Sequence, residues 1–480
     1  MQCNSIYKQG RGMHIHSIIN GQPVMGQASS FSVINPADES IIAEVSAASA
    51  AQVDEAVHAA SAAFKTWKNV SDDTVKQIFA KIAADIRAEK NSIAQLITQE
   101  QGKTLGMAQF EVEAGASWIE YLSSLEIPIE TLQEPNGKII KVYNRPLGVV
   151  ASVTPWNWPF MIAVWHIFPA LKTKNCVVNK PSEYTPLSTI KLAEIINRHI
   201  PAGVCSLVLG KGDVGQALTE HPEVAKVTFT GSTRTGQSIL GHSVSSLKSV
   251  VLELGGNDAG IVLKDANLDT AAEGIFASAF LNAGQTCAAL KRLYVHESIY
   301  DALTEKLLRI AEAQIVGNGA DAAVTFGPVQ NKMQYDKVKA LIADAVAQGG
   351  KILTASKALP EKGYFIAPTL IADVAEGIAL VDDEQFGPVL PIVKFSAIDE
   401  VLERTNNTQF GLGGSVWSTD LEQAQQIAAQ MEAGTVWINS HSDLSPAAPF
   451  GGWKLSGLGY SFGLDGLLLF THKQAVHITG

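Results

Sequence analysis

Short β-rich runs alternate with helix-patterned or turn-rich segments over much of the chain, and this alternation constrains the fold more than any other feature of the sequence. The first series of runs covers 148–153, 176–179, 204–209, 226–230 and 249–254. After Gly255-Gly256 the alternation resumes at 259–263, 292–296, 413–417 and 435–438. Strands separated by helices in this way are typical of parallel βαβ units. The pattern predicts two α/β domains joined near Gly255-Gly256.

The helical pattern is clearest near the N-terminus. Apolar positions recur at helical spacing over 51–67 and, after Ser71, over 75–86, and a further such segment at 421–431 separates the last two strands. Residues 138–144 instead alternate like a strand, which predicts an edge or an arm. With 480 residues the chain is too long for one hydrophobic core, so two or three domains are expected.

Composition and charge exclude several classes of protein. Hydrophobic residues make up 46% and charged residues 17%, which indicates a soluble globular protein. The net charge of -11, without a basic run, argues against a nucleic-acid partner. The most apolar stretch, 160–171, is broken by His166 and Pro169 and is too short to cross a membrane.

The ends of the chain and its cysteines indicate where the protein works. Residues 1–11 have the character of a polar extension and not of a secretory signal. The four cysteines, Cys3, Cys176, Cys205 and Cys287, show no metal-type spacing. We expect a cytoplasmic protein with no metal site.

One cysteine has the setting of an exposed nucleophile. Cys287 ends the run Leu-Asn-Ala-Gly-Gln-Thr-Cys at 281–287, among small and amide residues. A free cysteine more often fills buried space. Three other segments, however, offer groups that thiolate chemistry needs, namely Asn157, Glu253 and Glu384. We therefore take Cys287 as the candidate reactive centre.

Two glycine-containing segments are candidate phosphate sites. The run 210–215 follows a predicted strand, opens a helix and matches Gly-x-Gly-x-x-Gly, but the acidic residue expected about twenty positions later is missing. Gly231 and Ser232, at a strand end before a helix, are better candidates. Lys180 and Glu183, at another strand end, suit a nucleotide with ribose hydroxyls. Each glycine could equally form a simple turn, and Lys180 could be a solvated charge.

Seven motifs then appear in the order known from one family. They are Thr-Pro-Trp-Asn-Trp-Pro at 154–159, Lys-Pro-Ser-Glu at 180–183, Phe-Thr-Gly-Ser-Thr at 229–233, Glu-Leu-Gly-Gly-Asn at 253–257, Gly-Gln-Thr-Cys at 284–287, Glu-Gln-Phe-Gly-Pro at 384–388 and Pro-Phe-Gly-Gly-Trp-Lys at 449–454. Together they resemble the aldehyde dehydrogenase superfamily, in its NAD(P)-dependent, hydrolysing branch that does not acylate coenzyme A.

The resemblance implies an architecture of three parts. A variant Rossmann NAD-binding domain would comprise residues 13–123 and 147–255, and an α/β catalytic domain residues 256–454. A small β oligomerisation element would comprise residues 124–146 and 466–480. The implied assembly is a homodimer or homotetramer.

The resemblance and elementary chemistry agree on three catalytic roles. A Cys287 thiolate would add to an aldehyde carbonyl, and the Asn157 amide and the Cys287 N–H would stabilise the alkoxide. Loss of hydride to nicotinamide would leave a thioester. Glu253 would activate the water that releases the carboxylic acid. From the residue types alone, the ordinary interpretation of Asn157 is a turn residue, and that of Glu253 is a helix-cap or ion-pair carboxylate.

The resemblance also implies a cofactor site. Its residues would be Thr154, Trp156, Lys180, Glu183, Gly212, Gly231, Ser232, Leu254, Glu384 and Phe386. Glu384 would bind the nicotinamide ribose, although a solvated charge beside Asp382 and Asp383 is the plainer interpretation. A carboxylate at Glu183 would repel a 2′-phosphate, so NAD is predicted over NADP.

The substrate is predicted from what the expected tunnel contains. Relatives that act on succinate semialdehyde often carry arginines where this chain has Leu281 and Trp165, so the carboxylate clamp is missing. The tunnel would be apolar, formed by Trp158, Phe160, Trp165, Leu281, Leu444, Phe450 and Trp453. This favours a medium-chain or aromatic aldehyde, unless the aromatic residues simply pack the core.

Three alternatives stay open. His441 and Asp443 would favour a polar or cationic aldehyde, including an aminoaldehyde. Arg292 or Lys291 could hold the carboxylate of a semialdehyde. Outside enzymology, the chain could be a catalytically idle relative that serves as a structural or binding protein.

Overall fold

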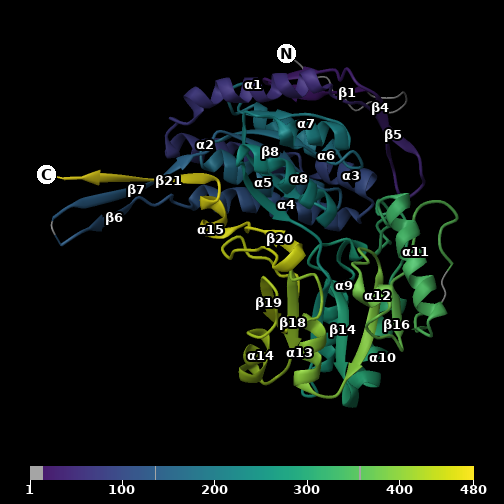
Figure 1. Ribbon diagram of the computed structural model, residues 1–480. Helices are drawn as coiled ribbons and strands as arrows, with labels where there is room; N and C mark the ends of the chain where they lie inside the picture. Colours follow the sequence, from purple (N-terminus) through teal and green to yellow (C-terminus); the bar gives the residue numbers. More distant parts are fainter. Residues whose placement is uncertain (1–13, 136, 356–357, 480) are drawn as a thin grey trace.

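The computed structural model describes residues 14–135, 137–355 and 358–479, so the predicted N-terminal extension and Cys3 lie outside the described residues. Figure 1 shows an upper body that carries α1 to α8, a lower body that carries α9 to α14, and an arm of strands that extends to one side with the C-terminus. The predicted α/β class is confirmed, because two large, mostly parallel sheets alternate with helices.

The upper body is built on an eight-stranded sheet in the order β20-β12-β11-β8-β9-β10-β2-β3. Its five central strands, from β12 to β10, are mutually parallel. They are β8 (Val149–Val153), β9 (Cys176–Lys180), β10 (Cys205–Leu207), β11 (Val224–Thr230) and β12 (Ser249–Glu253). The antiparallel edges are β2 (Ser17–Ile19), β3 (Gln22–Val24) and β20 (Gly457–Leu458). The strand order reverses between β8 and β11, which is where α/β sheets of this type bind ligands.

Eight helices cover this sheet. They are α1 (Ala50–Trp67), α2 (Asp72–Ala88), α3 (Lys90–Gln101), α4 (Leu105–Ser124), α5 (Pro159–Lys172), α6 (Leu187–Asn197), α7 (Gly212–Glu220) and α8 (Thr233–Ser243), with a 3-10 turn at Val244–Ser246. The first begins with a capping box between Ser49 and Gln52, and its buried stripe includes Val53 and Val57. The predicted amphipathic helices are therefore present.

The lower body is built on a seven-stranded sheet in the order β15-β16-β17-β14-β13-β18-β19, parallel except for β15. The strands are β13 (Asp258–Val262), β14 (Leu290–His296), β15 (Lys351–Ile352), β16 (Thr369–Ala372), β17 (Val389–Phe395), β18 (Gly413–Trp417) and β19 (Thr435–Ile438). Neighbouring residues face opposite cores: Ile261 belongs to one hydrophobic cluster and Val262 to the other. Both faces of the sheet are therefore buried.

Helices and short turns complete the lower body. They are α9 (Leu268–Ala279), α10 (Tyr300–Ala313), α11 (Lys332–Ala347), α12 (Ala379–Asp382), α13 (Ile398–Asn406) and α14 (Leu421–Ala428), with 3-10 turns at Leu281–Gly284 and Glu297–Ile299. The 3-10 turn Lys454–Ser456 and α15 (Gly463–Leu468) lie beside the upper body, next to β20 and β21 (Figure 1). The sequence pattern did not predict β16 and β17. Pro391 lies within β17, and proline inside a run argues against a central strand.

Two small sheets complete the fold. One contains β1 (His14–Ile15), β5 (Ile41–Ser46) and β4 (Ser30–Ile34). The other forms the arm, in which β7 (Ile139–Pro146) pairs with β6 (Glu130–Gln133) and with β21 (Thr471–Ile478) (Figure 1). Among the described residues, no helix is both long and apolar enough to span a membrane.

Candidate active site

The candidate site lies where the carboxyl edge of the upper sheet meets the amino edge of the lower sheet. Glu253 ends β12 and Asp258 begins β13. Between them, a Cβ on Gly255 would lie 2.5 Å from Glu384 Oε2, and one on Gly256 would lie 2.9 Å from the Cys287 carbonyl oxygen. These glycines therefore allow the segment after β12 to contact both the Cys287 and the Glu384 loops.

Cys287 follows a tight loop that is fixed by its own backbone. Asn282, Ala283 and Gly284 are left-handed, with φ of 53°, 56° and 73°. A Cβ on Gly284 would lie 2.2 Å from the Gly387 carbonyl oxygen, so this glycine is required by close approach. The Cys287 side chain is half-buried at the end of this loop.

The structure brings Asn157 to the Cys287 loop. Its buried amide Nδ2 donates to the Gln285 carbonyl oxygen at 3.0 Å, and its own carbonyl oxygen accepts from Asn282 Nδ2 at 2.8 Å. The next residue, Trp158, donates from Nε1 to Thr286 Oγ1 at 3.0 Å. Asn157 and Trp158 therefore hold both sides of the loop that presents the thiol.

A buried ion pair supports this contact, and sequence reasoning missed it. Lys103 Nζ lies 2.6 Å from Glu111 Oε2, and both side chains are 0% exposed. Lys103 Nζ also donates to the Asn157 carbonyl oxygen at 3.0 Å and lies 3.6 Å from the centre of the Trp158 ring. Burial lowers the pKa of Lys103 to about 8, against the opposing effect of Glu111.

The same carboxylate completes a helix that cannot cap itself. Trp158 is the N-cap residue of α5 and has no side-chain oxygen to bind the first N–H groups. Glu111 Oε1 accepts from the backbone N–H groups of Phe160 and Met161 at 3.0 and 3.1 Å. A carboxylate from α4 thus takes the place of the cap, where the helix dipole favours negative charge.

The two candidate reacting groups, Cys287 and Glu253, are held in surroundings that favour their neutral forms. Burial raises the pKa of the Cys287 thiol to about 12, and Lys291 opposes this shift. Burial also raises the pKa of Glu253 well above its usual range. Ser461 Oγ donates to Glu253 Oε1 at 3.3 Å, whereas Oε2 has no partner among the described residues. A carboxyl in such surroundings accepts a proton more readily than an exposed one.

The candidate cofactor residues lie along the carboxyl edge of the upper sheet. The Thr154 N–H donates to the Lys180 carbonyl oxygen at 3.1 Å, and the Gly231 N–H to that of Glu253 at 3.0 Å. Thr154 Oγ1 is buried without a partner among the described residues. These residues border the switch between β8 and β11, and Leu254 lies close by on Gly236 of α8.

Three cofactor candidates differ in whether the fold itself already uses them. The Ser232 hydroxyl caps α8 by accepting from the Thr235 N–H at 3.3 Å. Lys180 Nζ lies 3.7 Å from Glu183 Oε2, and burial lowers the pKa of Lys180. A Cβ on Gly212 would meet nothing within 4 Å, so no close approach requires glycine there.

The segment that carries Glu384 and Phe386 contacts Trp156 and the Cys287 loop. The rings of Trp156 and Phe386 lie edge to face, 5.3 Å apart. Glu384 Oε1 accepts from the Gly256 N–H at 2.9 Å and lies 3.6 Å from Lys291 Nζ. The carboxylate is therefore fixed near the Cys287 loop and is not a solvated charge.

Aromatic side chains gather beside the thiol loop, and two of them were not predicted. The Phe462 ring lies 4.7 Å from Trp165, 5.1 Å from Trp118 and 5.9 Å from Phe450. Neither Phe462 nor Trp118 stands in a motif, so no sequence signal pointed to them. A hollow beside this cluster is lined mainly by apolar and aromatic residues, including Trp118, Trp165 and Phe462.

The other predicted tunnel residues divide into three groups. Phe160 is fully buried, and Leu444 packs against the same core as Phe450. Trp158 and Leu281 belong to a small cluster with Met161 and Ile162. Trp453 is 54% exposed and packs on Gly411, so its ring does not join the aromatic cluster.

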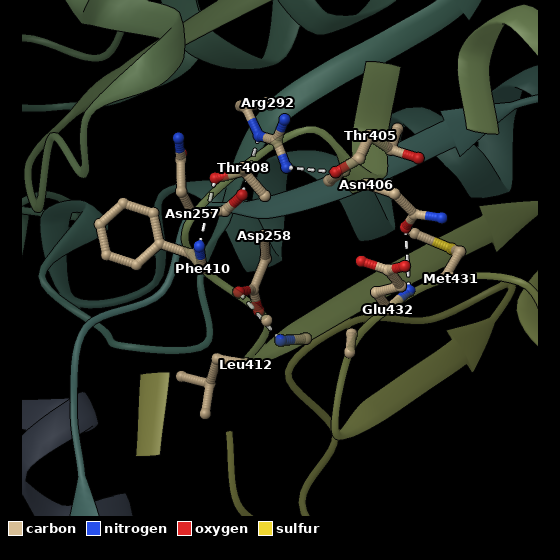
Figure 2. A pocket seen from close by; sticks show the side chains of 14 residues that line it. Asn257, Asp258, Arg292, Thr405, Asn406, Thr408, Phe410, Leu412, Met431 and Glu432 are labelled. Atoms are coloured by element: carbon tan, nitrogen blue, oxygen red, sulfur yellow. Dashed lines mark hydrogen bonds between the residues drawn. The ribbon is translucent and has the colours of Figure 1, made fainter. Parts of the chain in front are cut away.

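The polar alternatives differ in their surroundings. Arg292 donates to the carbonyl oxygens of Asn257 at 2.8 Å and Thr405 at 3.1 Å (Figure 2). His441 Nε2 lies 3.5 Å from Asp258 Oδ2, with both side chains fully buried, whereas Asp443 is exposed. Arg292 therefore stabilises backbone at the edge of the lower sheet.

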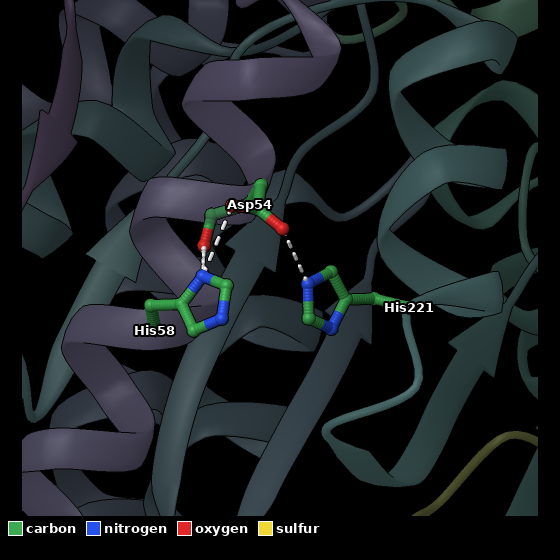
Figure 3. A group of neighbouring side chains, drawn as sticks. All are labelled: Asp54, His58 and His221. Atoms are coloured by element: carbon green, nitrogen blue, oxygen red, sulfur yellow. Dashed lines mark hydrogen bonds and ion pairs between the residues drawn. The ribbon is translucent and has the colours of Figure 1, made fainter.

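One group of metal-ligand type occurs in the part of the chain that the structure describes. Asp54, His58 and His221 offer ligand atoms within 4.8 Å of one another, on α1 and after α7 (Figure 3). Asp54 pairs with His58 Nδ1 at 3.0 Å and with His221 Nε2 at 3.1 Å. The three side chains satisfy one another, so we assign no metal to them.

Comparisons with known proteins cover nearly the whole chain. The sequence profile described as "Aldehyde dehydrogenase family" matches residues 24–476. Phenylacetaldehyde dehydrogenase of Pseudomonas fluorescens is 37% identical, over 96% of this chain and 95% of that protein. The mitochondrial aldehyde dehydrogenase of Leishmania tarentolae is 35% identical, over 96% of this chain and 94% of that protein.

Solved structures show the same similarity. The NAD⁺ complex of aldehyde dehydrogenase from Bacillus cereus superposes with a TM-score of 0.94 at 34% identity. The superposition covers 97% of this chain and 96% of that chain. The similarity in fold therefore includes both sheets and the edges at which they meet.

Proposed function

This chain belongs to the aldehyde dehydrogenase family, and from that premise we propose that it oxidises an aldehyde to the carboxylic acid with NAD, through a covalent adduct on Cys287. The observation that carries this proposal is the meeting of Cys287, Asn157 and Glu253 between the two sheets. Gly255-Gly256 and the hydrogen bond from Asn157 Nδ2 to the Gln285 carbonyl oxygen bring them together.

The first step is addition of the Cys287 sulfur to the aldehyde carbonyl carbon. The new C–S bond converts the carbonyl oxygen into an alkoxide, which needs donors aimed at it. The Asn157 amide and the backbone N–H of Cys287 supply them. Asn157 Nδ2 makes one hydrogen bond to a described residue, so its second N–H is available for the alkoxide.

Glu253 serves as the general base. Its buried carboxyl has a pKa well above the usual range, which makes its carboxylate a better proton acceptor. The unpartnered Oε2 is the atom that would take a proton from water. That water attacks the thioester carbon, the C–S bond breaks, and the acid leaves with the thiol restored.

The carboxyl edge of the upper sheet suits a dinucleotide. Buried Thr154 Oγ1 lacks a partner among the described residues and lies beside the switch point, where such cofactors bind. Thr154, Trp156, Lys180, Glu183, Gly212, Gly231, Ser232, Leu254, Glu384 and Phe386 would hold it. NAD, when bound, accepts the hydride that the adduct releases. We propose NAD over NADP because Glu183 places a carboxylate beside Lys180, 3.7 Å from its ammonium.

We propose a medium-chain or aromatic aldehyde as the substrate. The cluster of aromatic rings formed by Trp118, Trp165, Phe450 and Phe462 supports an apolar substrate, and phenylacetaldehyde dehydrogenase is among the relatives. Because Arg292 is held by two backbone carbonyl oxygens, it is a poor clamp for the carboxylate of a semialdehyde. Trp158, Leu281, Leu444 and Phe450 would complete the tunnel.

We further propose the domain roles that the family suggests. Residues 13–123 and 147–255 would bind the cofactor, residues 256–454 would carry the thiol, and residues 124–146 and 466–480 would form the oligomer contact. The arm leaves β21 with one unpaired edge, since β21 pairs only with β7 among the described strands. Such an edge suits pairing with a second copy, which supports a homodimer or a dimer of dimers.

The mechanism is tested with two variants and one absorbance assay. Cys287→Ala should abolish NADH formation from an aromatic aldehyde. Glu253→Gln should give a burst of about one NADH per site and then stall, because the thioester forms but is not hydrolysed. Steady turnover by Glu253→Gln would require another base, and turnover by Cys287→Ala would end the proposal.

A further inference from the structure

Lys291 is a buried cation that faces the nucleophile loop. It is the second residue of β14, and its side chain is 3% exposed. Its ammonium donates to the carbonyl oxygen of Thr286 at 3.0 Å and to that of Cys287. Glu384 Oε1 lies 3.6 Å away on the third side. The ammonium therefore joins two consecutive peptide groups of the loop to one carboxylate.

One of these peptide groups carries the proposed alkoxide donor. The Thr286 C=O and the Cys287 N–H belong to the same planar peptide unit, in which they point in opposite directions. The Thr286 oxygen accepts from Lys291 Nζ and from the Ala289 N–H at 3.1 Å. The Cys287 N–H makes no hydrogen bond to any other described residue. Holding the oxygen therefore fixes where the free N–H points.

A positive charge on the carbonyl side also strengthens the donor. Hydrogen bonds that share one polar group polarise each other, and bonds to ions are the stronger ones. An ammonium bound to the Thr286 oxygen draws electron density from the peptide and leaves its N–H more positive. This matters most when negative charge develops on the substrate oxygen.

We propose that Lys291 is a positioning residue of this enzyme, whose ammonium orients and polarises the Thr286–Cys287 peptide so that the Cys287 N–H stabilises the alkoxide. This inference rests on the proposed Cys287 chemistry. Lys291 would act through the peptide and would not touch the substrate.

Lys291 should also affect the pKa of the Cys287 thiol, through its charge. Glu253, Asp258 and Glu384 each act to raise the pKa of Cys287, together with burial, and Lys291 is the charge that opposes them. Loss of the ammonium would leave the thiol among carboxylates alone. Thiolate formation would then require a higher pH.

The position of Glu384 argues against a role for Lys291 in binding a substrate carboxylate. Glu384 Oε1 is held by the Gly256 N–H at 2.9 Å and by the ion pair with Lys291. The ammonium thus has an acceptor or a carboxylate in each of three directions. A substrate carboxylate would have to displace one of them.

The test uses Lys291→Met, which keeps an unbranched side chain without the ammonium, and Lys291→Gln, which keeps an N–H donor without the charge. Lys337→Met is the matched control, because Lys337 Nζ donates to the Glu384 carbonyl oxygen at 2.7 Å from an exposed position. Three quantities are measured: kcat with an aromatic aldehyde and NAD, the pH profile of Cys287 alkylation by iodoacetamide in the cofactor-free protein, and NAD binding by fluorescence titration.

Lys291→Met should lower kcat by about tenfold, less than the roughly 10²–10³ lost when a whole alkoxide donor is removed. Its alkylation profile should move to higher pH. The profile of Lys291→Gln should lie between those of Lys291→Met and the unmodified protein, and the profile of Lys337→Met should match that of the unmodified protein. An unshifted alkylation profile in whichever Lys291 variant folds would overturn the inference. So would a variant that loses NAD binding, measured by fluorescence titration, while its kcat at saturating NAD is unchanged.

These outcomes are distinct from failure of the proposed function. The alkylation profile needs neither aldehyde nor cofactor, so it reports on Lys291 even if the substrate has been misassigned. Turnover by Cys287→Ala would instead remove the reaction itself, whatever Lys291 does to the thiol.

Discussion

Two groups of charged side chains each join parts of the chain that lie far apart in sequence, and they differ in their exposure to water. The Lys103 and Glu111 side chains are both 0% exposed and tie α4 to Asn157, which in turn binds the loop that presents Cys287. Asp54 and His58 are more than half exposed, and together with His221 they tie α1 to the end of α7 (Figure 3). The contacts are similar in kind, but their surroundings are not.

The difference decides what each group can do for function. A buried ion pair has lost its hydration, so each charge depends on its partner and its hydrogen bonds, and removal of either leaves an uncompensated charge. An exposed group exchanges its partners for water at little cost. Only the buried pair can hold Asn157 and Trp158 in one position, and the substitutions below test this comparison.

Lys103→Met should have the largest effect. It leaves the Glu111 carboxylate buried without its cation, so we expect a loss of ~3–5 kcal/mol in the free energy of unfolding, measured by urea titration. The Asn157 carbonyl oxygen loses one of its two side-chain donors, so kcat should fall as well.

Lys90→Met is the matched control. Lys90 also pairs with a carboxylate of α4, Glu113, at 3.1 Å, but both side chains are about one-third exposed. This control should change stability by less than ~1 kcal/mol and leave kcat unchanged. Equal effects of the two variants would mean that burial is not what separates the two groups.

The double variant Lys103→Met with Glu111→Gln should recover part of the lost stability. Both charges are gone, and the glutamine oxygen can still accept from the first N–H groups of α5. We expect a coupling energy of ~0.5–3 kcal/mol in the double-mutant cycle. Strictly additive losses would show that the two side chains do not act as a pair.

Glu183→Ala tests a pair of intermediate burial, and its main effect should be on the cofactor. Removal of the carboxylate leaves Lys180 free to meet a 2′-phosphate, so we expect the KM for NADP to fall by about tenfold, equivalent to ~1.4 kcal/mol. Steady-state kinetics with both cofactors measure this. Glu194→Ala, which breaks the pair between Lys191 and Glu194, should leave the ratio of the two KM values unchanged.

Asp54→Asn should have the smallest effect, and the effect should depend on pH. The hydrogen bond with His221 lowers the pKa of Asp54 below its ordinary value of 3.8. A lowered pKa stabilises the fold above the unfolded value and ceases to do so as pH falls through the folded value. The variant should therefore melt slightly below the unmodified protein at pH 7, and the difference should vanish in acid and in high salt. A persistent difference at low pH would contradict this electrostatic account.

Much of the fold and part of the site could be predicted from local patterns. The strand that ends at Glu253 and the strand that follows Cys287 are predicted by β-rich runs, and the left-handed loop at 282–284 agrees with its small and amide residues. Strand β17 could not be predicted, because a proline such as Pro391 usually indicates an edge strand or a break. In the structure β17 is nevertheless a central strand, which pairs with β16 on one side and β14 on the other. The motifs predicted which residues would be near Cys287 but gave no signal for Phe462, Trp118 or Lys103.

The sequence by itself determined the two series of strands, the glycines at the crossing between them and the types of reactive group, because periodicity and backbone freedom are properties of neighbouring residues. Only the tertiary structure decided which charges are buried, and so which of them act. Lys103, Lys180 and Lys291 carry the same ammonium group. Their roles differ because the desolvation of a charge and the partner that compensates it depend on segments that meet only in the folded protein.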